Sequence, residues 1–300
     1  MTNSASPENL LQPENDGLTT RESGAWVAEK LHYVRRYIDM FTTSMRHRPW
    51  RSRRYIDLFA GPGKCRIRET DVIVLGSPLL AVTTDYPFTD YIFVESDAEN
   101  IAALKRRCEA ASLPSYIEYL TGDANRLAHS VADEIIQGDS RYLPGQWWSL
   151  NLAFLDPEGL ELEWSTVATL ARVERMDLIF HYPQSGLTRN LESFIDSDED
   201  TIVDRFFGDK GWRERYGELR EQGASFARIH RHLIDYYKSK LADLGYVNFF
   251  DQEFSAEPLI RNTRRNAPLY RLLFASKHEL GHKFWNEVTR RNVYGQPRLL

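Results

Sequence analysis

Apolar positions recur at spacings of three and four along the first strongly patterned stretch of the chain. This is the pattern of an amphipathic helix with one apolar stripe. We expect the helix to begin near Ser23 and to end before Pro49, since proline cannot continue a helix. The stripe consists of Leu31, Val34, Ile38, Phe41 and Met45.

Beyond this helix, short apolar runs alternate with helical stretches. Each run has the length of a strand and closes on an acid or a turn residue. Strands that alternate with helices at this spacing predict an α/β fold with a doubly wound, mostly parallel sheet. The expected strands are RYIDLF (54–59), YIFVES (91–96), SYIEYLTGDA (115–124), NLAFLDPEG (151–159), MDLIFHYP (176–183) and YRLLFAS (270–276).

Two segments depart from this rhythm. Residues 1–22 are polar and contain two prolines, which predicts a disordered leader. Residues 23–300 are expected to form a single domain. Within it, a stretch at 187–223 carries consecutive acids and then several aromatic residues, and we interpret it as an inserted helical lid.

Composition narrows the class of protein. The net charge is -5, which excludes a globally basic nucleic-acid binder. Residues 30–54 nevertheless hold eight Lys and Arg against one acid, a local cluster that suits a polyanion. Two cysteines form neither a disulfide framework nor a metal site. No apolar run is long enough to span a membrane, and we expect a cytoplasmic protein.

Three successive expected strands end in acids. Asp57, Glu95 and Asp123 hold these positions, and ligands of open parallel sheets bind beyond the carboxyl ends of the strands. Glu95 is placed to accept hydrogen bonds from ribose hydroxyls, and Asp123 to accept one from an adenine amine. Asp57 lies by the end of the ligand that is not the nucleoside. The turn after the first strand offers Gly61 and Gly63, whose backbone can approach a ligand closely. The remaining residues assigned to this site are Phe59, Ser96 and Ala124.

Phosphate-binding signatures are incomplete. The chain has no G-x-x-x-x-G-K-[ST], and Arg66 stands where a dinucleotide fingerprint needs its third glycine. A ligand with adenosine and no phosphate fits a site rich in carboxylates. S-adenosylmethionine is such a ligand.

Several motifs in order resemble a known family. Residues 55–64 (YIDLFAGPGK) resemble the first motif of class I methyltransferases, with Phe59 in place of the first glycine. The full set is similar to the three-Cys-motif partner family, TcmP, over about residues 25–290. The resemblance implies a seven-stranded class I methyltransferase fold, bound S-adenosylmethionine, and a radical-type partner protein with three cysteines. The further motifs are GSPLLA (76–81), FVESD (93–97), GDAN (122–125), FLDPEGL (154–160), SGLTRN (185–190) and YRLLFASKHELGHKFW (270–285).

The reaction side of the site is expected at FLDPEGL. Enzymes that methylate amines of bases carry [DNS]-P-P-[YFW] here, and only Asp156 and Pro157 match that pattern. We take these two as catalytic, with Asp156 as proton acceptor. Arg189, Asn190 and Lys64 are the expected substrate-binding residues. We interpret His181 as structural, and since neither cysteine follows a proline, we exclude cytosine C5 methylation.

Two functions remain open on the sequence. In the first, the chain transfers a methyl group to DNA or RNA, with basic residues 46–54 and RNTRR (261–265) on the phosphates. In the second, it is a non-catalytic cofactor-binding or structural subunit of its partner. The three strand-end acids favour cofactor binding, and the incomplete DPEG motif leaves catalysis open.

Overall fold

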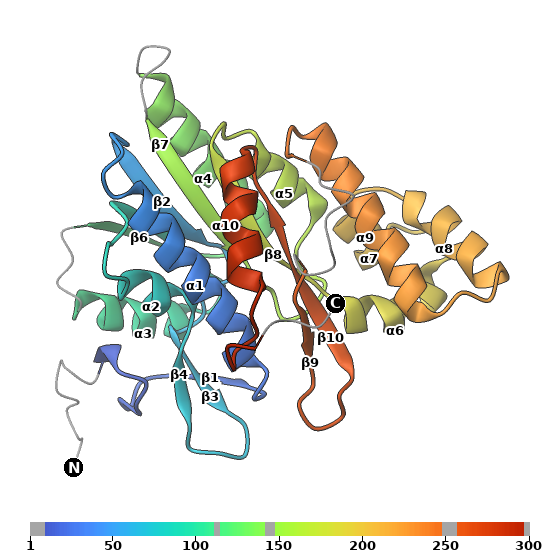
Figure 1. Ribbon diagram of the computed structural model, residues 1–300, viewed down its shortest axis with the longest axis horizontal. Coiled ribbons are helices and arrows are strands. Elements are labelled where there is room, and N and C mark those ends of the chain that lie inside the picture. Colours follow the sequence, from blue (N-terminus) through green and yellow to red (C-terminus); the bar gives the residue numbers. More distant parts are fainter. Residues whose placement is uncertain (1–9, 111–114, 142–147, 248–256, 297–300) are drawn as a thin grey trace.

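The computed structural model describes residues 10–110, 115–141, 148–247 and 257–296 (Figure 1). Within them, a seven-stranded sheet has the order β6-β5-β2-β7-β8-β10-β9. Strand β10 is antiparallel to both of its neighbours, and the other pairs are parallel. This confirms the predicted doubly wound, mostly parallel sheet of seven strands. The strands are β2 (Ser52–Asp57), β5 (Asp90–Glu95), β6 (Tyr116–Thr121), β7 (Ser149–Leu155), β8 (Met176–Tyr182), β9 (Leu259–Arg261) and β10 (Pro268–Ala275).

Helices cover both faces of the sheet and make three layers (Figure 1). One face carries α1 (Val27–Met45), α2 (Ser77–Val82), α3 (Ala98–Glu109) and α10 (Glu279–Thr289). The opposite face carries α4 (Ala124–Ser140), α5 (Trp164–Ala171), α6 (Gln184–Phe194), α7 (Ile202–Phe207), α8 (Gly211–Glu221) and α9 (Phe226–Asp243).

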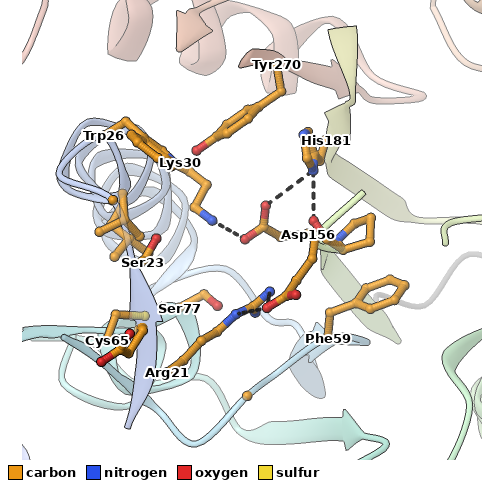
Figure 2. A pocket seen from close by; sticks show the side chains of 18 of the residues that line it. Arg21, Ser23, Trp26, Lys30, Phe59, Cys65, Ser77, Asp156, His181 and Tyr270 are labelled. Atoms are coloured by element: carbon orange, nitrogen blue, oxygen red, sulfur yellow. Dashed lines mark hydrogen bonds and ion pairs between the residues drawn. The ribbon is translucent and has the colours of Figure 1, made fainter. Parts of the chain in front are cut away.

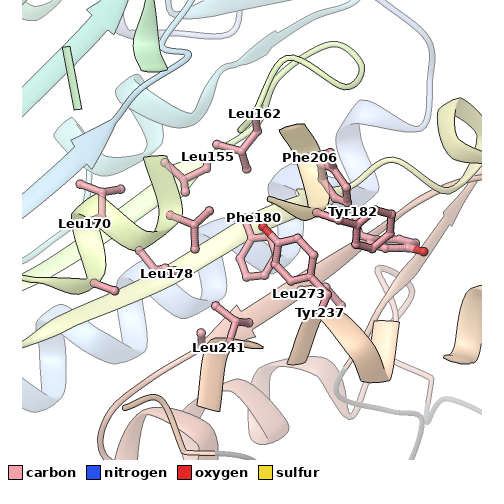
Figure 3. Packing of buried hydrophobic residues seen from close by; sticks show 14 of the residues in the cluster. Leu155, Leu162, Leu170, Leu178, Phe180, Tyr182, Phe206, Tyr237, Leu241 and Leu273 are labelled. Carbon is pink, nitrogen blue, oxygen red and sulfur yellow. The ribbon is translucent and has the colours of Figure 1, made fainter. Parts of the chain in front are cut away.

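The continuous apolar runs of the strands follow from this burial on two faces. Successive side chains of a strand point to opposite sides, so Tyr55 packs in one core and Ile56 in the other. Both side chains are fully buried. Figure 3 shows the second core, where Phe180 of β8 and Leu273 of β10 meet Tyr237 of α9. Because both faces of the sheet are buried, apolar residues follow one another along each strand instead of alternating with polar ones.

The predicted disordered leader is wrong for the part that the structure describes. Residues 10–23, which we call the N-terminal strap, pass over the loop that follows β2 and end in strand β1 (Arg21–Ser23). This strand belongs to a second, three-stranded sheet with β3 (Lys64–Ile67) and β4 (Ile73–Leu75). The strap carries Asp16, which is buried in ion pairs with Lys64 and Arg107. The polar composition of this segment gave no sign that one of its acids is buried and holds it to the protein. Residues 1–9 lie outside the described residues.

The stretch at 187–223 is helical and lies between β8 and β9 in the chain. It comprises most of α6 with α7 and α8. Its aromatic residues Phe206, Phe207 and Trp212 are fully buried and pack against α5 and α9 in the core. The start of α6 lies at the carboxyl edge of the sheet, where it borders the site described below.

The carboxyl ends of the parallel strands gather the loops that the sequence singled out, as ligand sites of such sheets require. The basic residues 46–54 do not join them. They run from the end of α1 into β2, at the amino edge, whereas the β9–β10 turn that contains RNTRR lies at the carboxyl edge (Figure 1). A six-residue strand, roughly 20 Å long, separates the two. The two basic segments therefore lie at opposite edges of the sheet, and their contact with one polyanion stays a prediction.

No helix among the described residues is long and apolar enough to cross a membrane.

Candidate functional site

Two cavities meet at the carboxyl edge of the sheet. The Asp156 cavity has a volume of about 250 Å³, and the Glu95 cavity has a volume of about 500 Å³. Five residues line both and form their junction: Arg21, Phe59, Gly61, Pro157 and Glu158. The loops after β2 and β7, adjacent strands on either side of the switch in strand order, thus contribute to both cavities.

The Glu95 cavity contains most of the residues predicted to bind a cofactor. Glu95 ends β5 and accepts from the backbone N of Gly61 at 2.8 Å through Oε2, and from Asp97 N at 3.0 Å through Oε1. Asp123 caps α4 by accepting from Arg126 N at 2.9 Å. Ser96 and Ala124 also line this cavity. Each carboxylate oxygen has two lone pairs, so Glu95 Oε2 retains capacity for a ligand hydroxyl.

Asp57 lies beneath the glycine loop rather than in the lining of either cavity. It is fully buried, and its carboxylate accepts from Ser77 Oγ at 2.6 Å and from Phe59 N at 3.2 Å. Burial raises the pKa of Asp57 to about 7, against the lowering effect of the Ser77 hydrogen bond. Asp57 therefore shapes the loop that a ligand would contact, in place of the direct contact expected from the sequence.

Gly61 has a backbone conformation and an environment that suit close approach of a ligand. Its φ is 62°, in the left-handed region that favours glycine. A Cβ placed there would have its nearest neighbours, atoms of the Arg21 side chain, at 4.0 Å. Packing within the protein does not fill this space. Gly63, at φ 90°, differs because a Cβ would stand 2.9 Å from Leu104, so its glycine is required by the core.

The Asp156 cavity is built around a charged pair that the sequence did not predict. Lys30 of α1 forms an ion pair with Asp156, at the end of β7, and the side chains are only 14% and 10% exposed (Figure 2). Burial opposes the charge of Asp156, but Lys30 and the other nearby cations lower its pKa below the usual value. Asp156 is therefore ionised, and its lowered pKa makes it a weaker base than we expected.

His181, interpreted from the sequence as structural, lies against this pair. Its Nδ1 is 2.9 Å from the carbonyl oxygen of Pro157 and 3.8 Å from Asp156 Oδ1. A carbonyl only accepts, so Nδ1 carries the proton. Burial lowers the pKa of His181 to about 4, and the imidazole is neutral near pH 7. The contact with Asp156 is therefore polar rather than ionic, and Nε2 keeps a lone pair.

Tyr270 completes the cluster. Its ring packs edge-on against His181, with centroids 4.2 Å apart, and the Lys30 ammonium lies 5.8 Å from the ring centroid. The phenol oxygen is buried and has no hydrogen-bond partner within the described residues. A buried hydroxyl without a partner is unfavourable, so this atom is a candidate contact for a ligand.

The three predicted substrate-binding residues separate in the structure. Arg189 is exposed and lines the Asp156 cavity. Asn190 donates to Gly186 O at 2.7 Å within its own helix and does not line this cavity. Lys64 lines the Asp156 cavity, but its ammonium is fully buried against Asp16, at 2.8 Å, and its contact with substrate stays a prediction. Two residues of the site were missed by the sequence reasoning. Arg21 lies in the predicted leader and Lys30 lies on a helix, and in both places the spacing of residues carries no signal for a site.

Comparisons with known proteins give the following. No family model and no curated protein matches the chain. Among solved structures, Trm1 from Pyrococcus horikoshii in complex with S-adenosyl-L-methionine aligns with a TM-score of 0.45 at 9% identity, over 93% of this chain and 58% of that one. Protein LPL1258 from Legionella pneumophila aligns with a TM-score of 0.36 at 12% identity, over 55% and 74%.

A third similar structure, YjhP from E. coli, has a TM-score of 0.30 at 12% identity, over 81% of this chain and 92% of that one. At these scores, the alignments say nothing of the reaction. The fold rests on the strand order itself.

Proposed function

We propose that this chain is an S-adenosylmethionine-dependent methyltransferase that acts on a nucleic acid. The observation that carries the proposal is the meeting of two cavities at the Gly61 loop. One cavity contains Glu95 and Asp123, and the other contains the polar cluster around Asp156 at the end of β7. This division suits a nucleoside cofactor on one side and a methyl acceptor on the other.

The residues present fit S-adenosylmethionine. The Glu95 cavity has a volume within the usual range for small-molecule sites. Glu95 would accept from the ribose hydroxyls, and Asp123 from the adenine amine. The open space beside Gly61 lets the ligand lie against bare backbone. When bound, the cofactor supplies an electrophilic methyl group on a sulfonium.

The Asp156 cavity would hold the acceptor. Asp156 stays ionised beside Lys30 and orients a donor group of the acceptor. His181 is neutral, with its proton on Nδ1, so the Nε2 lone pair can take a proton as the acceptor reacts. Its pKa of about 4 makes it a weak base, as Asp156 is. Pro157 O already accepts from this imidazole. The cluster thus differs from the open amine-binding arrangement of [DNS]-P-P-[YFW] enzymes.

A nucleic-acid substrate is supported by cations at the cavity itself. Arg68 and Arg189 are exposed and line it. Neither guanidinium takes part in an ion pair within the described residues. They replace residues 46–54 as the phosphate contacts that we propose. Affinity that depends on phosphates should fall steeply with salt.

The resemblance to the three-Cys-motif partner family adds a partner with three cysteines and radical-type chemistry. We also propose the cytoplasm as location, as expected from the composition of the sequence. The alternative of a non-catalytic subunit is favoured by one observation: Pro157 O and Asp156 already have partners within the chain. The two functions share cofactor binding and differ in methyl transfer.

Calorimetry with S-adenosylhomocysteine tests cofactor binding. Wild-type protein should bind, and Glu95→Ala should weaken affinity roughly 10- to 150-fold, since hydrogen bonds to a charged group contribute about 1.5–3 kcal/mol. Glu99→Ala, an exposed acid on α3 outside both cavities, is the matched control and should bind as wild type. Equal affinity of Glu95→Ala and wild type would remove Glu95 from the site.

Transfer of labelled methyl to DNA or RNA, with and without the three-cysteine partner, tests the reaction. Arg189→Gln should weaken binding of the nucleic acid and its salt dependence. Arg48→Gln, an exposed cation at the opposite edge of the sheet, should change neither. Cofactor binding without transfer to either nucleic acid, even with the partner present, would establish the non-catalytic alternative.

A further inference from the structure

The N-terminal strap places one cation at the junction of the two cavities. Strand β1 pairs in parallel with β3, and in this register Arg21 stands opposite Cys65. Cys65 follows the glycine loop by two residues. The pairing thus fixes Arg21 beside Gly61, and its side chain lines both cavities.

Buried charges hold the strap in this position. Asp16 accepts from Arg107 at 2.7 and 2.8 Å and pairs with Lys64 at 2.8 Å, and all three side chains are fully buried. Arg107 also donates to Thr19 O at 2.9 Å and to Pro62 O, which lies within the glycine loop. One guanidinium therefore connects the strap to the loop, and the position of Arg21 is set by buried contacts rather than by its own exposed ones.

The Arg21 guanidinium has unused donors on the side of the glycine loop. Its Nε and NH2 contact Glu158 Oε1 at 2.9 and 2.8 Å. Its NH1 lies 4.0 Å from the position that a Gly61 Cβ would take, and no hydrogen bond within the described residues uses NH1. The Glu158 side chain is 74% exposed, so this ion pair is screened by solvent and stabilises little.

The electrostatic environment keeps Arg21 charged. Burial opposes the charge, but the carboxylates of Asp156 and Glu158 hold the pKa of Arg21 above its usual value. Asp156 lines the Asp156 cavity, and Glu158 lies at its junction with the Glu95 cavity. Figure 2 shows Arg21 below the Lys30–Asp156 pair.

We propose that Arg21 binds the carboxylate of the amino-acid end of the cofactor. The inference rests on the proposed function. With the nucleoside held at Glu95, the amino-acid end has to pass the Gly61 loop to bring its sulfur to Asp156. Arg21 is the cation at that passage, and a guanidinium matches a carboxylate through parallel hydrogen bonds. Glu158 shares the guanidinium or yields it to the ligand.

Two ligands that differ in this carboxylate test the proposal by calorimetry. S-adenosylhomocysteine carries the amino-acid end, and 5′-methylthioadenosine keeps the nucleoside and sulfur without it. Arg21→Gln should lower the affinity for S-adenosylhomocysteine roughly 10- to 100-fold, as expected for loss of a charge-assisted pair. The affinity for methylthioadenosine should stay within about twofold of the wild-type value. Arg66→Gln, on the adjacent strand of the same small sheet and outside both cavities, should bind both ligands as wild type.

Glu158→Gln gives a second measurement, at an exposed position that folding does not depend on. The substitution releases Arg21, so the affinity for S-adenosylhomocysteine should rise and the affinity for methylthioadenosine should stay unchanged. Equal loss for both ligands in Arg21→Gln, or no loss for either, would overturn the assignment while wild-type binding upholds the proposed function. Wild-type protein that binds neither ligand would overturn the proposed function and the role of Arg21 together.

Discussion

His181 donates from Nδ1 to the carbonyl oxygen of Pro157 at 2.9 Å, across 24 residues of sequence. The bond joins the end of β8 to the turn after β7 and fixes the imidazole tautomer. With its pKa lowered to about 4 by burial, His181 is neutral and has a lone pair on Nε2. One contact thus orients the DPEG turn and leaves Nε2 without a proton; under the proposed function, Nε2 is the proton acceptor.

Replacement of His181 by Asn separates these two roles. The amide nitrogen of Asn can take the place of Nδ1 and preserve the bond to Pro157, but it supplies no equivalent of Nε2. We expect the fold and the affinity for S-adenosylhomocysteine to be retained and methyl transfer to fall roughly 10²- to 10⁴-fold. Transfer at the wild-type rate would leave His181 as a positioning residue only.

The Lys30–Asp156 pair should be strongly coupled in stability. Lys30→Met leaves a buried carboxylate without its cation and should cost roughly 3–5 kcal/mol of unfolding free energy. Lys30→Met combined with Asp156→Asn should cost less than the sum of the single changes. Urea denaturation of all four proteins measures the coupling. The exposed pair Lys283–Glu279 is the control, and additive costs at Lys30 and Asp156 would contradict the prediction.

Tyr270→Phe should make the protein slightly more stable and less active. The phenol oxygen is buried with no partner in the described residues, and an unsatisfied buried hydroxyl costs roughly 1–3 kcal/mol. Thermal unfolding should show a gain of about 1 kcal/mol, with a loss of acceptor binding. Destabilisation would mean that the hydroxyl has a partner in the folded protein, such as a bound water.

His230 should make the unfolding free energy depend on pH. It is buried between Tyr182 and Thr188, which contact its two ring nitrogens at 3.1 and 2.7 Å, and burial lowers its pKa to about 4. Its contribution is therefore complete above pH 6.5 and is lost as pH falls toward 4. Over this window, the stability advantage of wild type over His230→Gln should shrink by about 1.4 kcal/mol per pH unit. An advantage that stays constant would show that His230 is protonated or exposed in the native state.

The sequence alone determined the fold class and the edge of the sheet where a site would form. Hydrophobic period and turn residues are local properties. They located β2, β5, β6, β7 and β8, and the acids at the carboxyl ends of the first four. The carboxyl ends of parallel strands meet in space whatever the details of packing, so Glu95, Asp123 and Asp156 were predictable as neighbours of one site.

Only the tertiary structure decided which side chains face the cavities. Arg21 reaches the junction because a polar segment is held by Asp16, an anchor whose burial depends on Arg107, 91 residues away. Lys30 meets Asp156 across 126 residues, and the Lys64 ammonium is buried in an ion pair with Asp16. Such pairings depend on the packing of distant elements, and the energy of a buried charge depends on its surroundings, which no local pattern encodes.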